Sequence, residues 1–241
     1  MRRDLQSNMR MPLLTEENAK TIKGEERGVK TGILYLHSGV KVCAFASKGC
    51  MGGCLLTTGR GKFPVVKAGR IRKTAFLFEF RRHFIIKLCR ELEKIVRSAE
   101  RANMIPAARF DGTSDLGLAE EVCEKYPHVQ FYDYTKDPAR MRRFLMGKLP
   151  ANWHLTFSRS EENYQQAFAF LRQGAGVAMV FDTVPETYRG WRVIPGDHDD
   201  LRFMDRQVFG IEENQGYIVG LAAKGRAKKD TTGFVIRALR P

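Results

Sequence analysis

The sequence lacks any apolar run near the roughly 20 residues that a membrane-spanning helix needs. Acidic residues are also scarce, with 27 Asp and Glu against 41 Lys and Arg, so the formal net charge is +14. The first residues are charged and are not followed by the apolar segment of a secretory signal. Together these absences predict a soluble protein of the cytoplasm that does not associate with membranes.

Several common motifs are absent as well. No CxxC pair, GxGxxG or P-loop occurs, and the Gly-rich stretch at residues 59–62 does not have the P-loop spacing. The usual zinc knuckles and the commonest nucleotide-binding loops are therefore excluded. The five cysteines are an odd number in a chain predicted to be intracellular, which argues against a disulfide framework.

The excess of positive charge is uneven along the chain. Residues 60–101 hold 13 Lys and Arg against 4 Asp and Glu. Such a field attracts polyanions, so the sequence predicts a nucleotide or nucleic acid as partner. The alternative is a solvated basic face that only keeps the protein soluble. The candidate phosphate or nucleic-acid contacts lie in two basic segments and are Arg60, Lys62, Lys224, Lys228 and Lys229.

Short apolar segments alternate with helical patterns along most of the chain. Strands are expected near residues 33, 107, 131, 155, 179 and 219, with a last one over 234–239. A long amphipathic helix is expected over about 71–99, and shorter ones over 118–126, 138–146 and 161–172. This alternation predicts an α/β domain with a parallel sheet over residues 31–241, preceded by an irregular N-terminal arm over residues 1–30.

Polar residues follow successive strands of this predicted sheet. Because carboxyl ends of parallel strands meet at one edge, they predict one shared site there. Asp111, Asp133 and Lys136 are the candidate catalytic or substrate-contacting residues. Turn chemistry and helix caps are the alternative explanation. His198 could act as a general base or metal ligand, although an exposed acidic turn over residues 196–200 is the alternative.

Three cysteines lie in the Gly-rich loop over residues 38–62, after the first strand. Cys43, Cys50 and Cys54 have the spacing Cys-x6-Cys-x3-Cys. Thiolates favour zinc, copper(I) or iron–sulfur clusters. A 4Fe–4S cluster normally takes four cysteines, so three leave one iron open for a substrate or cofactor. A zinc ion with His37 as fourth ligand, or three free thiols, are the alternatives. Cys89 and Cys123 are predicted to be structural.

Several segments, among them VCAFASKGCMGGCL, FDGTSD, VQFYDYTK and GLAAKGRAKKDTTGFVI, resemble an uncharacterised bacteriophage family, the gene product 88 family. The resemblance extends from about residue 18 to residue 236. It implies a phage-encoded protein, and therefore the host-cell cytoplasm.

The arrangement also resembles radical S-adenosylmethionine enzymes, which have a partial (β/α)6 TIM-like barrel and a three-cysteine loop after the first strand. That resemblance implies a 4Fe–4S cluster on Cys43, Cys50 and Cys54 and S-adenosylmethionine as cofactor. The implied cofactor contacts are Gly112, Thr113, Ser114, Asp115, Ser158 and Arg159. The usual spacing of that superfamily is Cys-x3-Cys-x2-Cys with an aromatic residue before the last cysteine, whereas Gly53 precedes Cys54 here.

Three functions are consistent with these patterns. The first is a radical S-adenosylmethionine-like enzyme that acts on a nucleotide or nucleic acid, such as a DNA base that is modified. The second is a non-catalytic nucleic-acid-binding protein stabilised by zinc or an iron–sulfur cluster. The third is a metal-dependent nuclease using Asp111, Asp133 and His198, for which no recognisable carboxylate motif is present.

Overall fold

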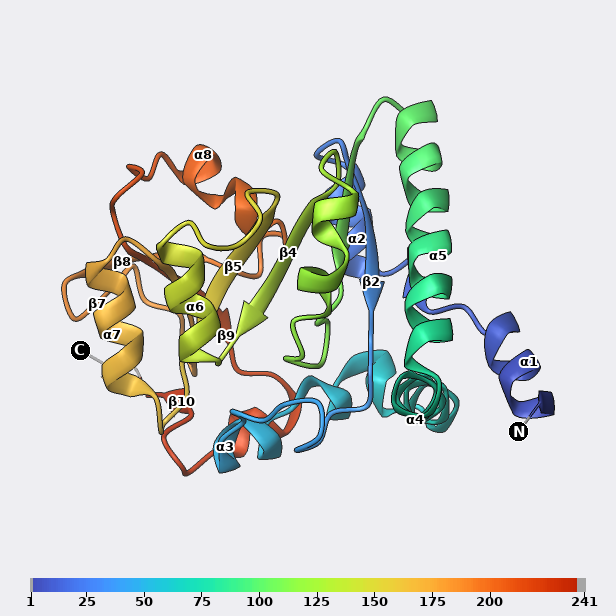
Figure 1. The fold of residues 1–241 in the computed structure, drawn as a ribbon. Coiled ribbons are helices and arrows are strands. Elements are labelled where there is room, and N and C mark those ends of the chain that lie inside the picture. Colours follow the sequence, from blue (N-terminus) through green and yellow to red (C-terminus); the bar gives the residue numbers. More distant parts are fainter. Residues whose placement is uncertain (1, 238–241) are drawn as a thin grey trace.

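The chain folds into an open, mostly parallel β-sheet with helices packed against one face (Figure 1). The computed structural model describes residues 2–237. The predicted mixed α/β class is confirmed. The ten strands seen in this range follow the order β1-β2-β3-β4-β5-β6-β9-β8-β7, with β10 paired to β6, and the sheet does not close into a barrel.

All six predicted strands are present and form the parallel centre of the sheet in sequence order. They are β2 (Val29–Leu34), β3 (Ile105–Arg109), β4 (Gln130–Thr135), β5 (Trp153–Ser158), β6 (Gly176–Phe181) and β9 (Tyr217–Ala222). Three short strands extend its edges: β1 (Leu14–Thr15), β7 (Thr187–Tyr188) and β8 (Trp191–Pro195).

The prediction of an irregular arm over residues 1–30 is wrong for the residues that the structure describes, because they form regular elements. Helix α1 (Arg2–Arg10) is followed by β1 and then by helix α2 (Ala19–Glu25). Helix α2 starts with a capping box, in which Asn18 accepts from the backbone of Thr21 and the Thr21 hydroxyl accepts from the backbone of Asn18. The Asn-x-x-Thr spacing was the available sequence signal.

The long helix predicted over residues 71–99 is two helices. Helix α4 (Pro64–Glu79) ends at Phe80, and helix α5 (Arg81–Arg101) leaves in another direction, so that α4 is seen end-on below α5 in Figure 1. The rings of Phe76 and Phe84 are 5.4 Å apart. Eight residues of one straight helix would separate them by about 12 Å. The break at Phe80 therefore lets both rings enter the same core.

The other helices agree with the predictions in part. Helix α6 (Pro138–Leu145) is confirmed with its Asp137 cap, and α7 (Tyr164–Arg172) starts three residues later than predicted. The helix predicted over 118–126 is two 3-10 turns, Leu118–Glu121 and Cys123–Lys125. Short helices α3 (Lys48–Gly52) and α8 (Asp205–Phe209) were not predicted. Among residues 2–237 we find no helix with the length and apolarity to span a bilayer.

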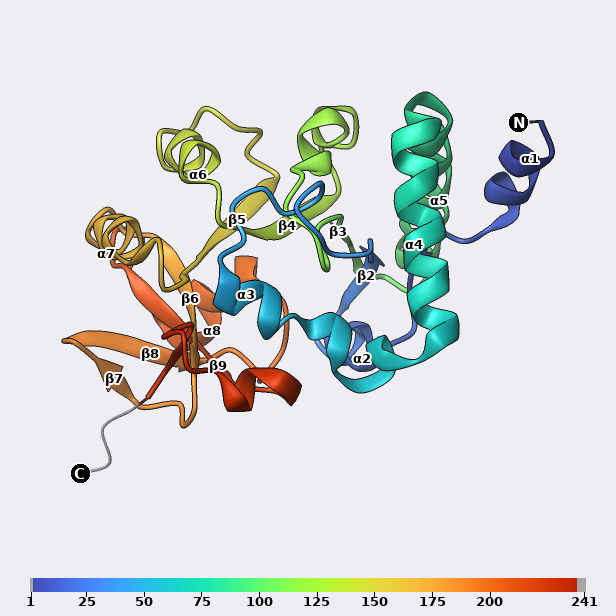
Figure 2. The same cartoon turned by 90° about the horizontal axis from the view of Figure 1, so that it is seen from below.

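The two faces of the sheet differ in what covers them. Helices α5, α6 and α7 pack against one face, where alternate strand residues such as Phe131, Leu155 and Met179 form the main core. Segment 199–211 packs against the other face, next to Tyr132 and Tyr217. In Figure 2, α5, α6 and α7 accordingly lie on one side of the strands and α2 and α8 on the other. The crossovers that contain α5, α6 and α7 thus return on the same side, whereas the connection from β6 to β9 carries α8 on the other side.

The last strand pairs with the end of one central strand, β6, beyond the part of β6 that pairs with β5. Strand β10 (Val235–Ile236) pairs with the end of β6 at Val180 and Phe181, whereas β5 pairs with the start of β6. Strand β9 occupies the other edge of β6 along its whole length. The predicted last strand is therefore present over these two residues, although its predicted end at residue 239 lies outside the described range.

Candidate metal centre at the strand ends

The cysteine loop is fixed to the carboxyl end of the sheet by one carboxylate. Glu161, in the segment after β5, accepts hydrogen bonds from the Ser47 hydroxyl and the Gly49 amide, both at 2.7 Å. Ser47 also caps α3, because its hydroxyl accepts from the amide of Cys50. Residues more than 110 positions apart in sequence are thus joined, and α3 crosses the strand ends (Figure 2).

The three thiols of this loop have different surroundings. Cys43 is partly buried against the main core, with its sulfur 3.8 Å from the Thr113 carbonyl. Cys50 packs against a small cluster that includes Phe234 and Val235. The Cys54 sulfur lies 3.3 Å from the Ser38 hydroxyl. Burial, together with the nearby Asp115 carboxylate and the other two thiols, raises the pKa of the Cys43 thiol to about 12.

The distances between side chains bear on which metal would fit. Among residues 2–237, no three His, Cys, Asp or Glu side chains lie close enough together to hold one metal ion, so His37 does not complete a tight site with the cysteines. Thiolates sharing a zinc ion, each about 2.3 Å from it, lie within about 4.6 Å of one another. Thiolates on a four-iron cluster bind different irons and lie farther apart. In the part of the chain that the structure describes, the cysteine side chains are thus not arranged as a ready site for a single ion.

Cys89 and Cys123 lie apart from this loop, as predicted. Cys123 is fully buried in the main core, and Cys89 on α5 packs against it. Both are free thiols. They therefore serve as matched controls for the cysteines of the loop.

The segment after β3 packs against the start of the cysteine loop. The Asp115 amide donates to the Val42 carbonyl at 2.7 Å, and the Thr113 hydroxyl donates to the Leu36 carbonyl at 2.6 Å. A Cβ at Gly112 would lie 2.7 Å from the Leu34 carbonyl oxygen, so only glycine fits. The Ser114 hydroxyl donates to Asp111. The predicted cofactor segment Gly112–Asp115 therefore adjoins the cysteines, and its side chains already have partners.

Asp111 and Asp133 form a buried pair that organises the strand ends. Asp111 accepts from Ser114 and from the amides of Leu116 and Gly117, at 2.6, 3.0 and 2.7 Å. Asp133 accepts from the Asp111 amide at 2.7 Å. Burial raises the pKa of Asp111 and, together with the charge of Asp111, that of Asp133. Asp111 thus holds a turn, the alternative that the sequence also allowed, Asp133 links neighbouring strand ends, and His198 does not join them in a metal group within residues 2–237.

The ends of β4 and β5 are joined by polar contacts. The Lys136 ammonium donates to the Ser158 hydroxyl at 2.7 Å. Asp115 accepts from the Lys136 amide and from the Arg140 guanidinium, at 2.7 and 2.6 Å. Arg159 donates to the carbonyls of residues 233 and 234, at 2.7 and 2.9 Å, and so holds the start of β10. The structure thus brings Lys136, Ser158 and Asp115 to one edge.

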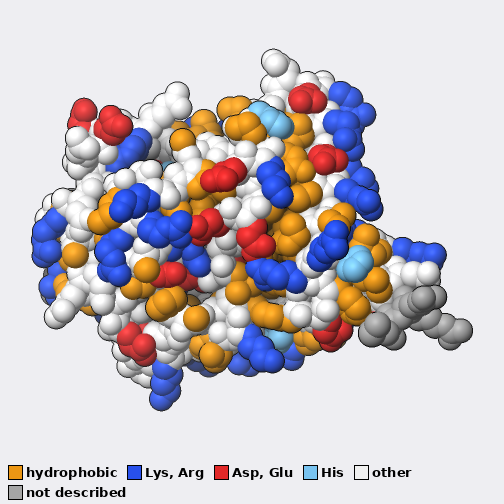
Figure 3. Space-filling view, in the orientation of Figure 1, with side chains coloured by type: hydrophobic (Ala, Val, Ile, Leu, Met, Phe, Trp, Pro, Cys, Tyr) orange, Lys and Arg blue, Asp and Glu red, His pale blue; other side chains and the backbone are white. Residues whose placement is uncertain are grey.

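The two basic segments predicted to contact phosphate lie next to each other. The 3-10 turn Leu55–Thr57, just before Arg60 and Lys62, contacts the 3-10 turn Gly225–Lys229. Arg60, Lys62, Lys224, Lys228 and Lys229 are all exposed, and Lys224 pairs with Asp197. In Figure 3, Lys and Arg side chains gather over α6 and α7 on the left of the face and along α5 on the right.

Arg70 on α4 is a site residue that the sequence pattern did not single out. Its guanidinium lies 5.0 Å from the centre of the Tyr35 ring and in the neighbourhood of Cys54. Among the described residues, its buried Nη1 has no hydrogen-bond partner. A donor of this kind beside a thiol can bind an anionic group. In the sequence, Arg70 is recognisable only as one of the many basic residues of segment 60–101.

A buried ionic cluster on the opposite face of the sheet was also missed. Arg109 of β3 pairs with Asp200, which also accepts from the Lys20 ammonium at 3.0 Å. Burial alone would raise the pKa of Asp200, but Arg109 and Lys20 hold it well below its ordinary value. The available signal was a charged residue, Arg109, within a predicted strand.

The acidic turn near His198 is exposed only in part, since Asp197 and His198 are exposed whereas Asp199 and Asp200 are buried. Asp199 and Asp200 are 8% and 5% exposed because the arginines around them require buried counter-charges. His198 itself is half exposed and lies 3.1 Å from Asp199. The contacts described for His198 therefore do not include the cysteine loop.

The model of one protein family, described as gene product 88, matches residues 12–238. The chain belongs to the gene product 88 family. This confirms the family resemblance predicted from the sequence, and it extends over nearly all of the chain. Neither a curated protein nor a solved structure matches this gene product 88 protein.

Proposed function

We propose that this gene product 88 protein is an iron–sulfur enzyme of the radical S-adenosylmethionine type that acts on a nucleotide or nucleic acid. The observation that carries the proposal is the docking of the three-cysteine loop over the carboxyl ends of parallel strands. The Glu161 hydrogen bonds and the contact between Cys43 and Thr113 hold it there. Sites of α/β proteins form at this edge.

The winding of the sheet also supports the proposal. Six parallel strands in sequence order, with the packed helices on one face, correspond to the arrangement of a partial (β/α)6 barrel left open. In such a barrel the first strand is followed by the cluster loop. Here that strand is β2, and Cys43, Cys50 and Cys54 follow it.

Different residues at the carboxyl edge of the sheet would bind the cluster and the S-adenosylmethionine. Cys43, Cys50 and Cys54 would hold a 4Fe–4S cluster with one open iron. When bound, the cluster supplies the one-electron reductive cleavage of S-adenosylmethionine. Segment Gly112–Asp115 adjoins Cys43, and Arg70 offers an unpaired donor beside Cys54 that suits a cofactor carboxylate. The protein orients the cofactor and excludes water around it.

The remaining candidate residues would act on the substrate side. Lys136 and Ser158 are hydrogen-bonded at the ends of adjacent strands and could bind or move a proton at the substrate. Exposed Arg60 and Lys228, from the two basic segments that touch, would contact phosphate.

Anaerobic purification tests the proposal directly. We expect a brown protein with about four irons and as many sulfides per chain, and 5′-deoxyadenosine when S-adenosylmethionine and a reductant are added. Cys50→Ala should remove most of the iron, whereas Cys89→Ala, which also deletes one thiol, should retain it.

A colourless protein with one zinc per chain would overturn the enzyme proposal. It would favour the second function, a non-catalytic nucleic-acid-binding protein stabilised by metal. A protein that holds the cluster but leaves S-adenosylmethionine intact under reduction would also contradict the proposed reaction.

A further inference from the structure

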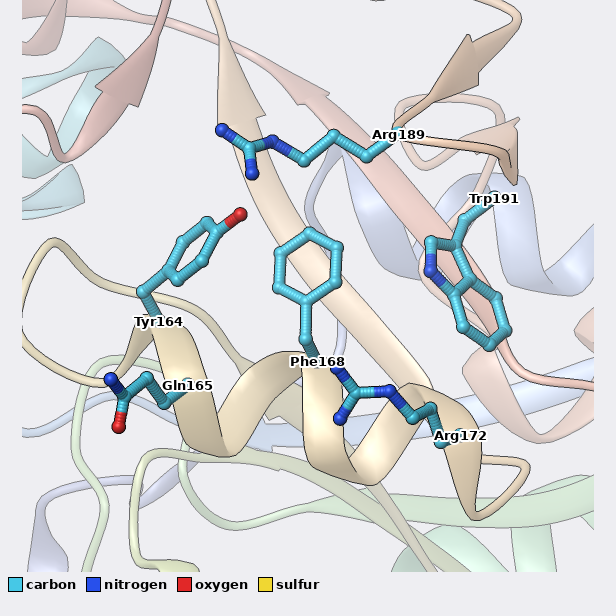
Figure 4. A pocket seen from close by; sticks show the side chains of 6 residues that line it. All are labelled: Tyr164, Gln165, Phe168, Arg172, Arg189 and Trp191. Carbon is cyan, nitrogen blue, oxygen red and sulfur yellow. The ribbon is translucent and has the colours of Figure 1, made fainter.

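A cleft of about 600 Å³ opens on the surface between α7 and the β7–β8 hairpin. It lies away from the cysteine loop and contains none of the residues predicted to bind phosphate. Three aromatic rings, two arginines and one amide line it. These residues are Tyr164, Gln165, Phe168, Arg172, Arg189 and Trp191 (Figure 4).

The fold supplies the two walls separately. Tyr164, Phe168 and Arg172 are spaced by four residues and therefore lie on one face of α7. The other wall is the hairpin, whose two turn residues, Arg189 and Gly190, have φ values of 51° and 81°. Two positive φ values fit a tight hairpin turn, in which Asn is normally favoured over Arg at the first position. Figure 4 shows the Phe168 ring between the two walls, with Arg189 reaching toward Tyr164 on one side and Trp191 on the other.

The aromatic rings of the cleft differ in how accessible they are, since Phe168 is buried whereas Tyr164 and Trp191 are only half-buried. The rings of Tyr164 and Phe168 are 4.7 Å apart, and the Arg189 guanidinium is 5.2 Å from the Tyr164 ring centre. Trp191 faces the same space from the hairpin (Figure 4). Planar ligands bind such surfaces by stacking, without regard to their hydrogen-bonding edges.

The charge of the cleft restricts the ligand to an anion. Within residues 2–237, no carboxylate forms an ion pair with Arg172 or Arg189. Cationic ligands of aromatic cages are excluded, since two guanidinium groups would repel them. Guanidinium groups pair well with phosphates and also stack on bases. A ligand with planar rings and regularly spaced phosphates satisfies both requirements.

The cleft is connected to the proposed metal centre through a short stretch of chain. The Arg159 guanidinium lies 5.9 Å from the centre of the Tyr164 ring, and Glu161 holds the cysteine loop. Tyr164 follows Glu161 by three residues. A chain-like ligand bound in the cleft could therefore continue toward the carboxyl ends of the strands.

We propose that this cleft binds single-stranded nucleic acid, with a base stacked on Trp191 and phosphates held by Arg172 and Arg189. Bases in a duplex are stacked on each other and do not present their faces, so a duplex should bind less well. That the bound nucleic-acid strand is the substrate of the enzyme rests on the proposed function. The binding itself does not depend on the metal.

Tryptophan fluorescence provides the test, because the chain has two tryptophans and Trp153 is only 1% exposed. We expect a thymidine oligonucleotide of about 12 nucleotides, within the usual site size, to quench the Trp191 emission. Trp191→Phe should lose the quenching but still bind by fluorescence anisotropy. Trp191→Ala should bind about 5- to 100-fold more weakly.

Matched charge variants test the arginines. Arg172→Ala combined with Arg189→Asn, which keeps a residue tolerant of positive φ, should weaken binding at least about tenfold and lower the salt slope by about 1.4. Arg90→Ala combined with Arg97→Ala removes the same charge from exposed positions of α5 and should change the affinity little.

Each of three results would overturn the proposal. The oligonucleotide does not quench the Trp191 emission, or the arginine variants of the cleft and of α5 lose the same amount of binding affinity. The third is that heparin, duplex DNA and single-stranded DNA bind with equal affinity. Iron content is measured on the same preparations. Failed binding with the cluster present overturns the cleft alone, and intact binding without iron overturns the iron–sulfur proposal alone.

Discussion

Gly49 sits at the tightest contact between the cysteine loop and the rest of the protein. A Cβ at this position would lie 2.2 Å from the Thr232 hydroxyl, 2.5 Å from the Phe234 Cβ and 2.8 Å from a Glu161 carboxylate oxygen. A side chain of any size would therefore push α3 away from both neighbours. Gly52 belongs to the same helix, and nothing lies within 4 Å of its Cβ position.

Gly49→Ala should undock the loop, whereas Gly52→Ala should not. We expect the Gly49 variant to lose about 1–3 kcal/mol of unfolding free energy from overpacking and to retain less iron after anaerobic purification. Denaturant unfolding and iron analysis measure both effects. Equal iron content in the two variants would show that docking of α3 is not needed to hold the metal.

At this scale the sequence revealed the residues that carry their own chemistry. The three clustered cysteines, Asp137 as a helix cap and the polar strand ends were recognisable from residue type and spacing. Glu161 and Arg70 were not, because their roles come from partners far away in the sequence. Asp111 was recognised as a candidate acid, but its three donors show that it holds a turn.

Helix α3 and the end of β5 are coupled through the two hydrogen bonds that Glu161 accepts. Glu161→Ala removes both, and a hydrogen bond to a charged group is worth about 1.5–3 kcal/mol. We expect amide hydrogen exchange over residues 47–54 to become at least about tenfold faster. Glu162→Ala, at the exposed neighbouring position, is the control. Unchanged exchange in Glu161→Ala would mean that other contacts hold α3.

The elements that the sequence predicted best are those defined by local pattern. The six parallel strands are short apolar runs bounded by turn residues, and each was found. The division between α4 and α5 was missed, because apolar residues recur every fourth position through Phe80, as they would in one continuous helix. Only the contact between the Phe76 and Phe84 rings in the folded structure reveals that the chain bends there. Strand β10 has two residues and depends on its partner β6.

The whole molecule balances buried charges whose effects on stability have opposite signs. Asp200, paired with Arg109 and Lys20, has a lowered pKa, so its contribution is present above the unfolded value near 4 and is lost in acid. Burial raises the pKa of Asp205 to about 7 despite Arg202, whose Nη1 lies 3.4 Å away. Its contribution is present below pH 4 and is lost as pH rises toward 7.

Asp205→Asn should therefore flatten the pH dependence of stability. Between about pH 4 and pH 7 the folded wild type retains a proton that the unfolded chain releases, so its unfolding free energy should fall by up to about 4 kcal/mol. Urea unfolding at several pH values measures this slope. Glu213→Gln, at an exposed position, is the control. The same slope in Asp205→Asn as in the wild type would contradict this assignment.

The position of β10 near the end of the chain determines when the cysteine loop can dock during synthesis. Cys50 packs against Ala227, Phe234 and Val235, and Arg159 holds the backbone that leads into β10. A ribosome must therefore translate nearly all of the chain before the cysteine loop, made from its first quarter, has a surface to dock on. Until then the three thiols of the nascent chain are exposed to oxidants and metals in the cell. Delivery of the proposed cluster would therefore follow release of residue 236 from the ribosomal tunnel, as a post-translational step.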